Sequence, residues 1–248
     1  MPCRGAAPLL IAAACAGADH AESAPATDSS SFEPTNFRFT LANISDPGGL
    51  STSAGPTDIG LGPALVVVHV AGFSLFEAGA NAEDTPLESL AEDGDPTALT
   101  TALSADPDIA AVRSLAVLDG DYHAAAMLPG ESAYVVANVG PEDRVDVVFM
   151  FGQSNDTLVA TPPGGVAFVP PLSEVGFSMA ADLHLYDAGT EVNEEPGAGP
   201  NQAPRQAAPD TGIPEGGVIT ETSGMDAQGY AWPSIPEFLT LTVAPDDP

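Results

Sequence analysis

Alternation of apolar and polar residues predicts strands at both ends of the chain. Residues 36–44 (NFRFTLANI) place Phe37, Phe39 and Leu41 on one face, and residues 238–243 (FLTLTV) alternate in the same way. A period of two is typical of strands with one buried face. Apolar or partly alternating runs predict further strands at residues 64–71, 112–118, 133–139, 145–151, 166–169 and 175–186.

Residues 72–111 interrupt this strand pattern. Residues 86–91 (PLESLA) and 96–103 (PTALTTAL) each begin with Pro after Thr or Asp, which is typical of the first turn of a helix. In Asp93-Gly94-Asp95 a turn is favoured, with Asp95 as a cap for the second helix. Antiparallel strands without a strand–helix–strand rhythm predict an all-β antiparallel sandwich with a short, partly helical insertion, one domain over residues 36–245.

The N-terminal residues have the pattern of an export signal. Arg4 precedes the apolar run 5–14 (GAAPLLIAAA), which is too short to span a bilayer. Residues 1–18 are therefore interpreted as a signal peptide cleaved after Ala18, or as a lipoprotein signal with Cys15 as the lipidated residue. The polar residues 19–35 predict a flexible tether. The protein is expected outside the cell or lipid-anchored at its surface.

Cysteine and charge exclude several classes of function. Both cysteines, Cys3 and Cys15, lie in the export segment, so the domain is expected to have no disulfide and no thiolate metal site. The chain has 35 acidic residues against 5 basic ones, a net charge of −30. Nucleic acid and anionic membranes would both repel it. Most of the acids are interpreted as a solvated surface suited to high salt, and a few as ligands of divalent cations.

Two acidic loops follow predicted strands. Asp156 lies in residues 152–157 (GQSNDT), and Asp187 and Glu191 lie in residues 186–191 (YDAGTE). In an antiparallel meander that returns through residues 166–169, two reversals bring the second loop to the end of the sandwich where the first lies. Clustered carboxylates repel one another unless a cation joins them, and calcium takes oxygen ligands. The sequence therefore predicts a calcium site, with a plain solvated turn as the alternative.

Several strings together resemble the spondin N-terminal domain, the family of F-spondin, mindin and many bacterial exported proteins. The string LYDAGTEVNEEPG (185–197) resembles the family's DAGT-acid motif, and VVFMFGQSNDTLVA (147–160) resembles the segment that carries a Ser-Pro-Asp-Trp motif in the animal members. Together the matching strings cover about residues 36–245. The others are FRFTLANIS (37–45), VVVHVAGFSLFEAGANA (66–82), LESLAEDGDPTAL (87–99) and FLTLTVAP (238–245).

This resemblance implies a C2-like sandwich with one calcium ion held by Asp156, Asp187 and Glu191. Thr157 stands where the family usually has an aromatic residue, Glu191 stands where it has Asp, and the disulfides of the animal members are missing. The implied function is adhesion or recognition through an unidentified protein or glycan partner, without catalysis. We expect a monomer.

Two alternatives remain from the sequence. A hydrolase could use paired carboxylates or a His–acid pair, with His69, His123 and His184 as candidates. The sequence lacks the Gly-x-Ser-x-Gly, His-Glu-x-x-His and phosphate-loop motifs. His69 is expected in the core and His184 at the surface. The other alternative is a metal-free structural domain from a high-salt environment.

Overall fold

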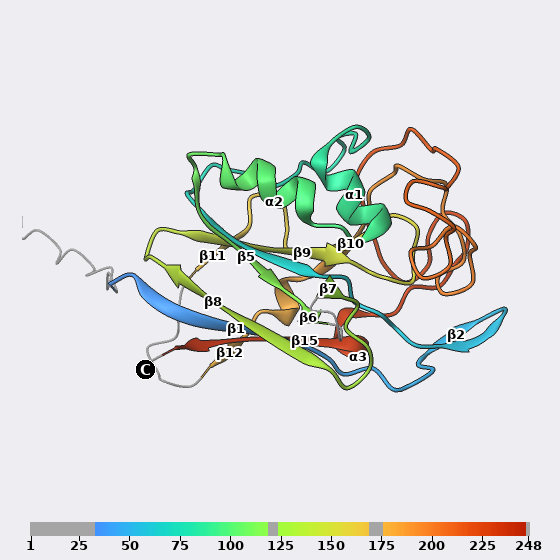
Figure 1. Ribbon diagram of the computed structural model, residues 1–248, viewed down its shortest axis with the longest axis horizontal. Helices are drawn as coiled ribbons and strands as arrows, with labels where there is room; N and C mark the ends of the chain where they lie inside the picture. The colour runs from blue at the N-terminus through green and yellow to red at the C-terminus, as the bar shows by residue number, and fades with distance from the viewer. Residues whose placement is uncertain (1–32, 119–123, 169–175, 247–248) are drawn as a thin grey trace, which may run out of the picture. The chain divides into compact units, whose positions relative to one another are not determined.

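The computed structural model describes residues 33–118, 124–168 and 176–246. The predicted export signal with Cys15, most of the tether and His123 lie outside these residues. In the described part, two antiparallel sheets pack face to face, with two helices on the outer side of the larger sheet (Figure 1). This arrangement confirms the predicted all-β sandwich with a small helical insertion.

The smaller sheet joins the two ends of the domain. Strand β1 pairs with β15 on one side, with Leu41 opposite Leu241, and with β8 on the other. Its strands, in spatial order, are β12 (Phe177–Ser178), β15 (Leu239–Pro245), β1 (Thr35–Asn43) and β8 (Ser132–Val139).

The larger sheet carries the loops that matter for function. Its strands, in spatial order, are β14 (Thr220–Thr222), β13 (His184–Asp187), β10 (Thr157–Ala160), β9 (Arg144–Met150), β4 (Ala64–His69) and β5 (Ile109–Leu115), with β11 (Val166–Ala167) also beside β9. Two small ribbons pair β2 (Leu50–Thr52) with β3 (Gly55–Thr57) and β6 (Val117–Leu118) with β7 (Ala124–Ala125).

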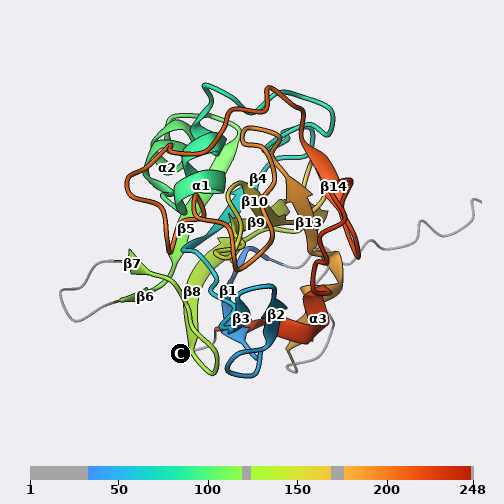
Figure 2. The same ribbon diagram turned by 90° about the vertical axis from the view of Figure 1, so that its right-hand side faces the viewer.

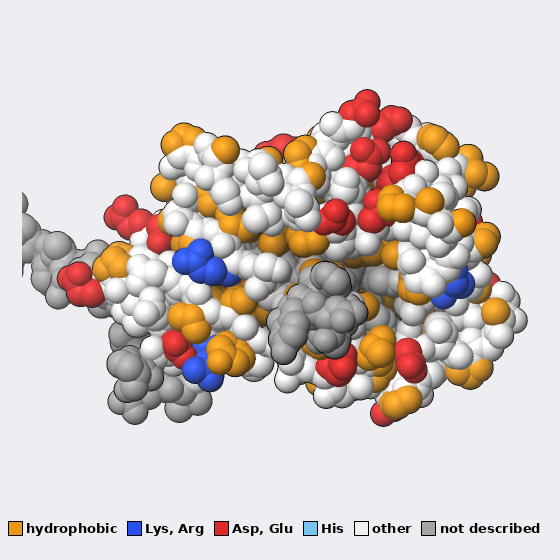
Figure 3. Space-filling model, viewed as in Figure 1, with side chains coloured by type: hydrophobic (Ala, Val, Ile, Leu, Met, Phe, Trp, Pro, Cys, Tyr) orange, Lys and Arg blue, Asp and Glu red, His pale blue; other side chains and the backbone are white. Residues whose placement is uncertain are grey.

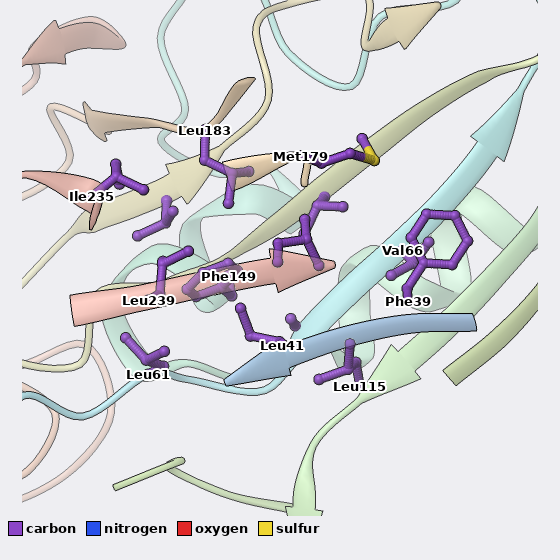
Figure 4. Packing of buried hydrophobic residues seen from close by; sticks show 14 of the residues in the cluster. Phe39, Leu41, Leu61, Val66, Leu115, Phe149, Met179, Leu183, Ile235 and Leu239 are labelled. Atoms are coloured by element: carbon purple, nitrogen blue, oxygen red, sulfur yellow. The ribbon is translucent and has the colours of Figure 1, made fainter. Parts of the chain in front are cut away.

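The main core lies between the two sheets. Phe39 and Leu41 of β1 meet Phe149 of β9 there, and all three side chains are fully buried (Figure 4). Burial of such apolar surface is the main source of the free energy of folding.

A second core lies on the outer face of the larger sheet. Helices α1 (Pro86–Asp93) and α2 (Thr97–Ser104) confirm the two predicted helical segments. Leu90 of α1 and Leu99 of α2 pack with Leu65 and Val67 of β4, so β4 is buried on both faces. This explains why β4 reads as a continuous apolar run. As predicted, the Asp95 carboxylate accepts a hydrogen bond from the Thr97 N–H (2.9 Å) at the start of α2.

Several segments differ from the prediction. The described part of residues 175–186 is not one strand, because β12 belongs to the smaller sheet and β13 to the larger, with the 3-10 turn η1 (Ala180–Asp182) between them. Strands β2, β3, β7, β10 and β14 lie outside the predicted strands. The short helix α3 (Ile235–Phe238) precedes the last strand. In the described part of the chain, no helix is long and apolar enough to cross a membrane.

Candidate metal centre

The pairing of β10 with β13 brings two predicted site residues together. Asp156 ends the loop after β9, and the next residue, Thr157, lies directly opposite Asp187 in the antiparallel register. The Ala188 N–H also donates to the Asp156 carbonyl (3.1 Å). The predicted return through residues 166–169 was wrong, because the unpredicted strand β10 lies next to β13 itself.

Asp156 is a fully buried carboxylate that is only half satisfied. Its Oδ2 accepts hydrogen bonds from the N–H groups of Thr190 (3.0 Å) and Glu191 (3.1 Å). Its Oδ1 is buried and has no hydrogen-bond partner among the described residues. Burial, followed by the charge of Asp187, raises the pKa of Asp156 to about 8. Such a group is costly to ionise unless a positive charge lies beside it.

Asp156 and Asp187 form an acidic group with Glu215. One carboxylate oxygen from each of the three residues lies within 4.8 Å of the others. Asp187 is half-buried, and its carboxylate accepts hydrogen bonds from the Gly189 N–H (2.8 Å) and the Asn193 side chain. Glu215 is exposed. Calcium holds oxygens about 2.3–2.6 Å away, so two of its ligands lie at most about 5 Å apart. The spacing therefore fits a metal ion.

Backbone pairing next to Gly189 brings Glu215 to this group. The carbonyls of Gly189 and Thr190 accept hydrogen bonds from the N–H groups of Gly217 (2.7 Å) and Glu215 (2.8 Å). Gly189 has a φ of +69°, and a Cβ on it would lie 2.6 Å from the Val218 nitrogen. Only glycine fits that conformation and that close approach.

The third predicted ligand, Glu191, has its carboxylate in a different acidic group. Its backbone N–H faces Asp156, but its side chain lies with Glu92 and Asp210, again with one oxygen from each within 4.8 Å of the others. Glu191 and Glu92 are 2% and 3% exposed, so both carboxylates are buried. Burial, together with the nearby Glu191 charge, raises the pKa of Glu92 to about 7. The structure thus divides the predicted trio between two groups.

Sequence reasoning missed Glu215, Glu92 and Asp210. Glu215 and Asp210 lie in a Pro- and Gly-rich stretch without periodicity, and their approach depends on backbone pairing with residues 189–192. Glu92 directly follows the predicted helical segment 86–91, where an acidic residue is expected to be solvated. No local signal in the sequence could have placed these residues at a site.

The described histidines have partners away from both acidic groups. His69 is fully buried, with Nε2 3.1 Å from Asp146 Oδ2. His184 lies at the surface and contacts Glu221 through Nδ1 (2.8 Å). Both placements agree with the sequence-based expectation of a core residue and a surface residue.

Comparison of the sequence with models of protein families and with curated proteins gives no match. The class of protein is therefore defined by the fold and the site. It is an antiparallel β-sandwich whose described residues include two acidic groups that could hold a metal ion.

Proposed function

We propose that this protein is an exported, calcium-binding β-sandwich of the spondin N-terminal type, which serves adhesion or recognition and not catalysis. The observation that carries the proposal is Asp156, whose buried Oδ1 lacks a hydrogen-bond partner in the described part while its carboxylate lies beside those of Asp187 and Glu215. A divalent cation would satisfy that oxygen and remove the repulsion among the three carboxylates.

The chemistry of the ligands favours calcium. Both acidic groups consist of carboxylates alone, which suit hard cations, whereas zinc is usually held with His or Cys. Asp156 and Asp187 come from strand ends, and Glu215 comes from an irregular segment. Calcium accepts such irregular oxygen sets, with water and carbonyl groups completing the shell, more readily than magnesium, which requires near-octahedral geometry.

A hollow beside the first acidic group supports a recognition role. It has a volume of about 470 Å³ and is lined by Asp187 and Glu215 together with Val218 and Met225. Val218 and Met225 are 46% and 68% exposed, so the hollow offers apolar as well as acidic surface to a partner. A cation that fixes these loops would lower the entropy cost of binding a protein or glycan partner there.

Thermal unfolding with calcium tests the proposal. In 1 M NaCl, calcium at about 100 times its dissociation constant should stabilise the folded protein by about 2.7 kcal/mol. That corresponds to a rise in melting temperature of about 5–10 °C for a domain of this size. Asp187→Asn should weaken calcium binding by about 10–100-fold or more, because it removes a ligand charge with little change in shape.

The matched control is Asp46→Asn, which removes an exposed acid outside both acidic groups. It should leave the calcium-induced shift unchanged. The proposal fails if calcium does not raise the melting temperature, or if Asp187→Asn responds to calcium like the unchanged protein.

A further inference from the structure

The second acidic group joins three distant parts of the chain. Glu92 lies in the last turn of α1, Glu191 follows β13, and Asp210 lies in the Pro-rich segment before β14. The orange and red loops that carry Glu191 and Asp210 lie beside α1 (Figure 2), and acidic side chains gather over this part of the surface (Figure 3). The group is thus a junction between a helix and two loop segments.

One oxygen in this group is buried without a partner. Glu191 Oε1 accepts a hydrogen bond from the Gly212 N–H (2.6 Å), whereas Oε2 has no hydrogen-bond partner among the described residues. The carboxylate packs so closely that a Cβ on Gly212 would lie 2.0 Å from Glu191 Cδ. A buried, unsatisfied carboxylate oxygen is costly, and native proteins usually pair such an atom with a donor, a water molecule or an ion.

The neighbouring basic residue already has other partners. Arg205, five residues before Asp210, donates to the Gly199 carbonyl (2.8 Å) and to the side-chain oxygens of Gln153 (3.1 Å) and Gln202. A different contact, from Gln206 Nε2 to Asp93 Oδ1 (2.7 Å), already holds this segment against α1. Arg205 is thus engaged with neutral oxygens. The contact of Gln206 with Asp93 holds the chain around Asp210 close to Glu92 and Glu191, although the three carboxylates repel one another.

We infer that Glu92, Glu191 and Asp210 form a second divalent-cation site, which fastens the segment around Asp210 to helix α1. Calcium fits the all-carboxylate ligand set for the same reason as at the first group. The inference rests on its own three residues and holds whether or not the group around Asp156 binds an ion. The two groups flank residues 190–191, whose N–H groups both donate to Asp156.

Calcium stoichiometry tests this second site. Equilibrium dialysis of the full chain in 1 M NaCl should give two calcium ions per molecule at saturation. Glu92→Gln should bind one ion under the same conditions. Asp210→Asn should also bind one, and it places no strain on the fold, because Asp210 is exposed with a φ of +53° that Asn adopts readily. Glu83→Gln, an exposed acid outside both groups, should retain two ions.

The same measurement separates this inference from the proposed function. One ion per molecule that is lost in Asp187→Asn and kept in Glu92→Gln and Asp210→Asn would overturn the second site and leave the first intact. One ion that is lost in Glu92→Gln and Asp210→Asn but kept in Asp187→Asn would support the second site and overturn the first. Two ions in both Glu92→Gln and Asp210→Asn would also overturn the second site.

Discussion

At the scale of single residues, the buried pair of His69 and Asp146 should make stability depend on pH. His69 Nδ1 lies 2.9 Å from the Val70 carbonyl, Nε2 lies 3.1 Å from Asp146 Oδ2, and the Thr161 hydroxyl donates to Asp146 Oδ1 (2.6 Å). Burial lowers the pKa of His69, but the interactions with Asp146 and the Val70 carbonyl outweigh burial and raise it above 6.5. The folded protein therefore binds this proton more tightly than the unfolded chain.

The direction of the pH dependence follows from the coupling of proton binding to folding. The stabilisation by His69 is fully present below its unfolded pKa and is lost as pH rises through the raised folded value. We predict that His69→Gln, which keeps an N–H donor for Asp146 but cannot titrate, lowers the unfolding free energy by about 1–3 kcal/mol at pH 5.5. The difference should shrink by pH 8.5. Urea unfolding at several pH values measures the difference in unfolding free energy between the two proteins. Titration of the carboxylates that both proteins share cancels in this difference.

His184→Gln is the control for this experiment. It removes a surface histidine whose partner is Glu221, so it should change stability by about 1 kcal/mol or less. If the difference in unfolding free energy between His69→Gln and the unchanged protein does not change with pH, the prediction that His69 is protonated beside Asp146 is wrong.

At the scale of elements, the helical layer should be an integral part of the fold. Leu90 of α1 is fully buried against the larger sheet, whereas Thr101 of α2 is exposed. Leu90→Ala should lower the unfolding free energy by about 2–5 kcal/mol, because it leaves a cavity between helix and sheet. Thr101→Ala should change it by about 0.5 kcal/mol or less. Equal effects in denaturant unfolding would mean that the layer can detach without loss of the sandwich.

The elements that sequence could predict are those with a strong local pattern. Strands β1 and β15 alternate clearly, β4 is a continuous apolar run, and both helical segments have a Pro after Thr or Asp at their start. The structure places all five within a few residues of the prediction. Strand β10 was missed because its four residues follow a polar loop directly and are too short for a pattern. The sequence predicts one strand at residues 175–186, because the change of sheet at η1 depends on tertiary pairing that leaves no local pattern.

The candidate site, too, could be predicted only where local sequence patterns determine the position of a residue. The proximity of Asp156 and Asp187 could be predicted, because antiparallel topology restricts where strand ends lie, although the chain returns through β10 and not through residues 166–169. The position of the Glu191 carboxylate could not, because its backbone and its side chain face different neighbours. Glu215 and Asp210 reach their groups only through long-range contacts of the Pro-rich segment.

At the scale of the whole molecule, charge imbalance should govern the response to salt. The net charge is −30 with five arginines, and the arginines offset little of the repulsion. Arg144 donates to the carbonyls of Gly164 and Gly165, and Arg205 to neutral oxygens, while Arg38 pairs with Asp246 at the surface. Self-repulsion of like charges destabilises a compact state, and added salt screens it.

We therefore predict that the melting temperature rises with NaCl from 0.05 to 1 M, as the screening length falls from above 10 Å to about 3 Å. KCl should act like NaCl, because screening depends on ionic strength and not on the identity of the ion. Millimolar calcium adds almost nothing to ionic strength at 1 M NaCl, so a calcium shift that persists there would have to come from binding to the acidic groups. A melting temperature that falls with NaCl would instead mean that attractive ion pairs outweigh the repulsion. A calcium shift that vanishes at 1 M NaCl would reduce the role of calcium to screening.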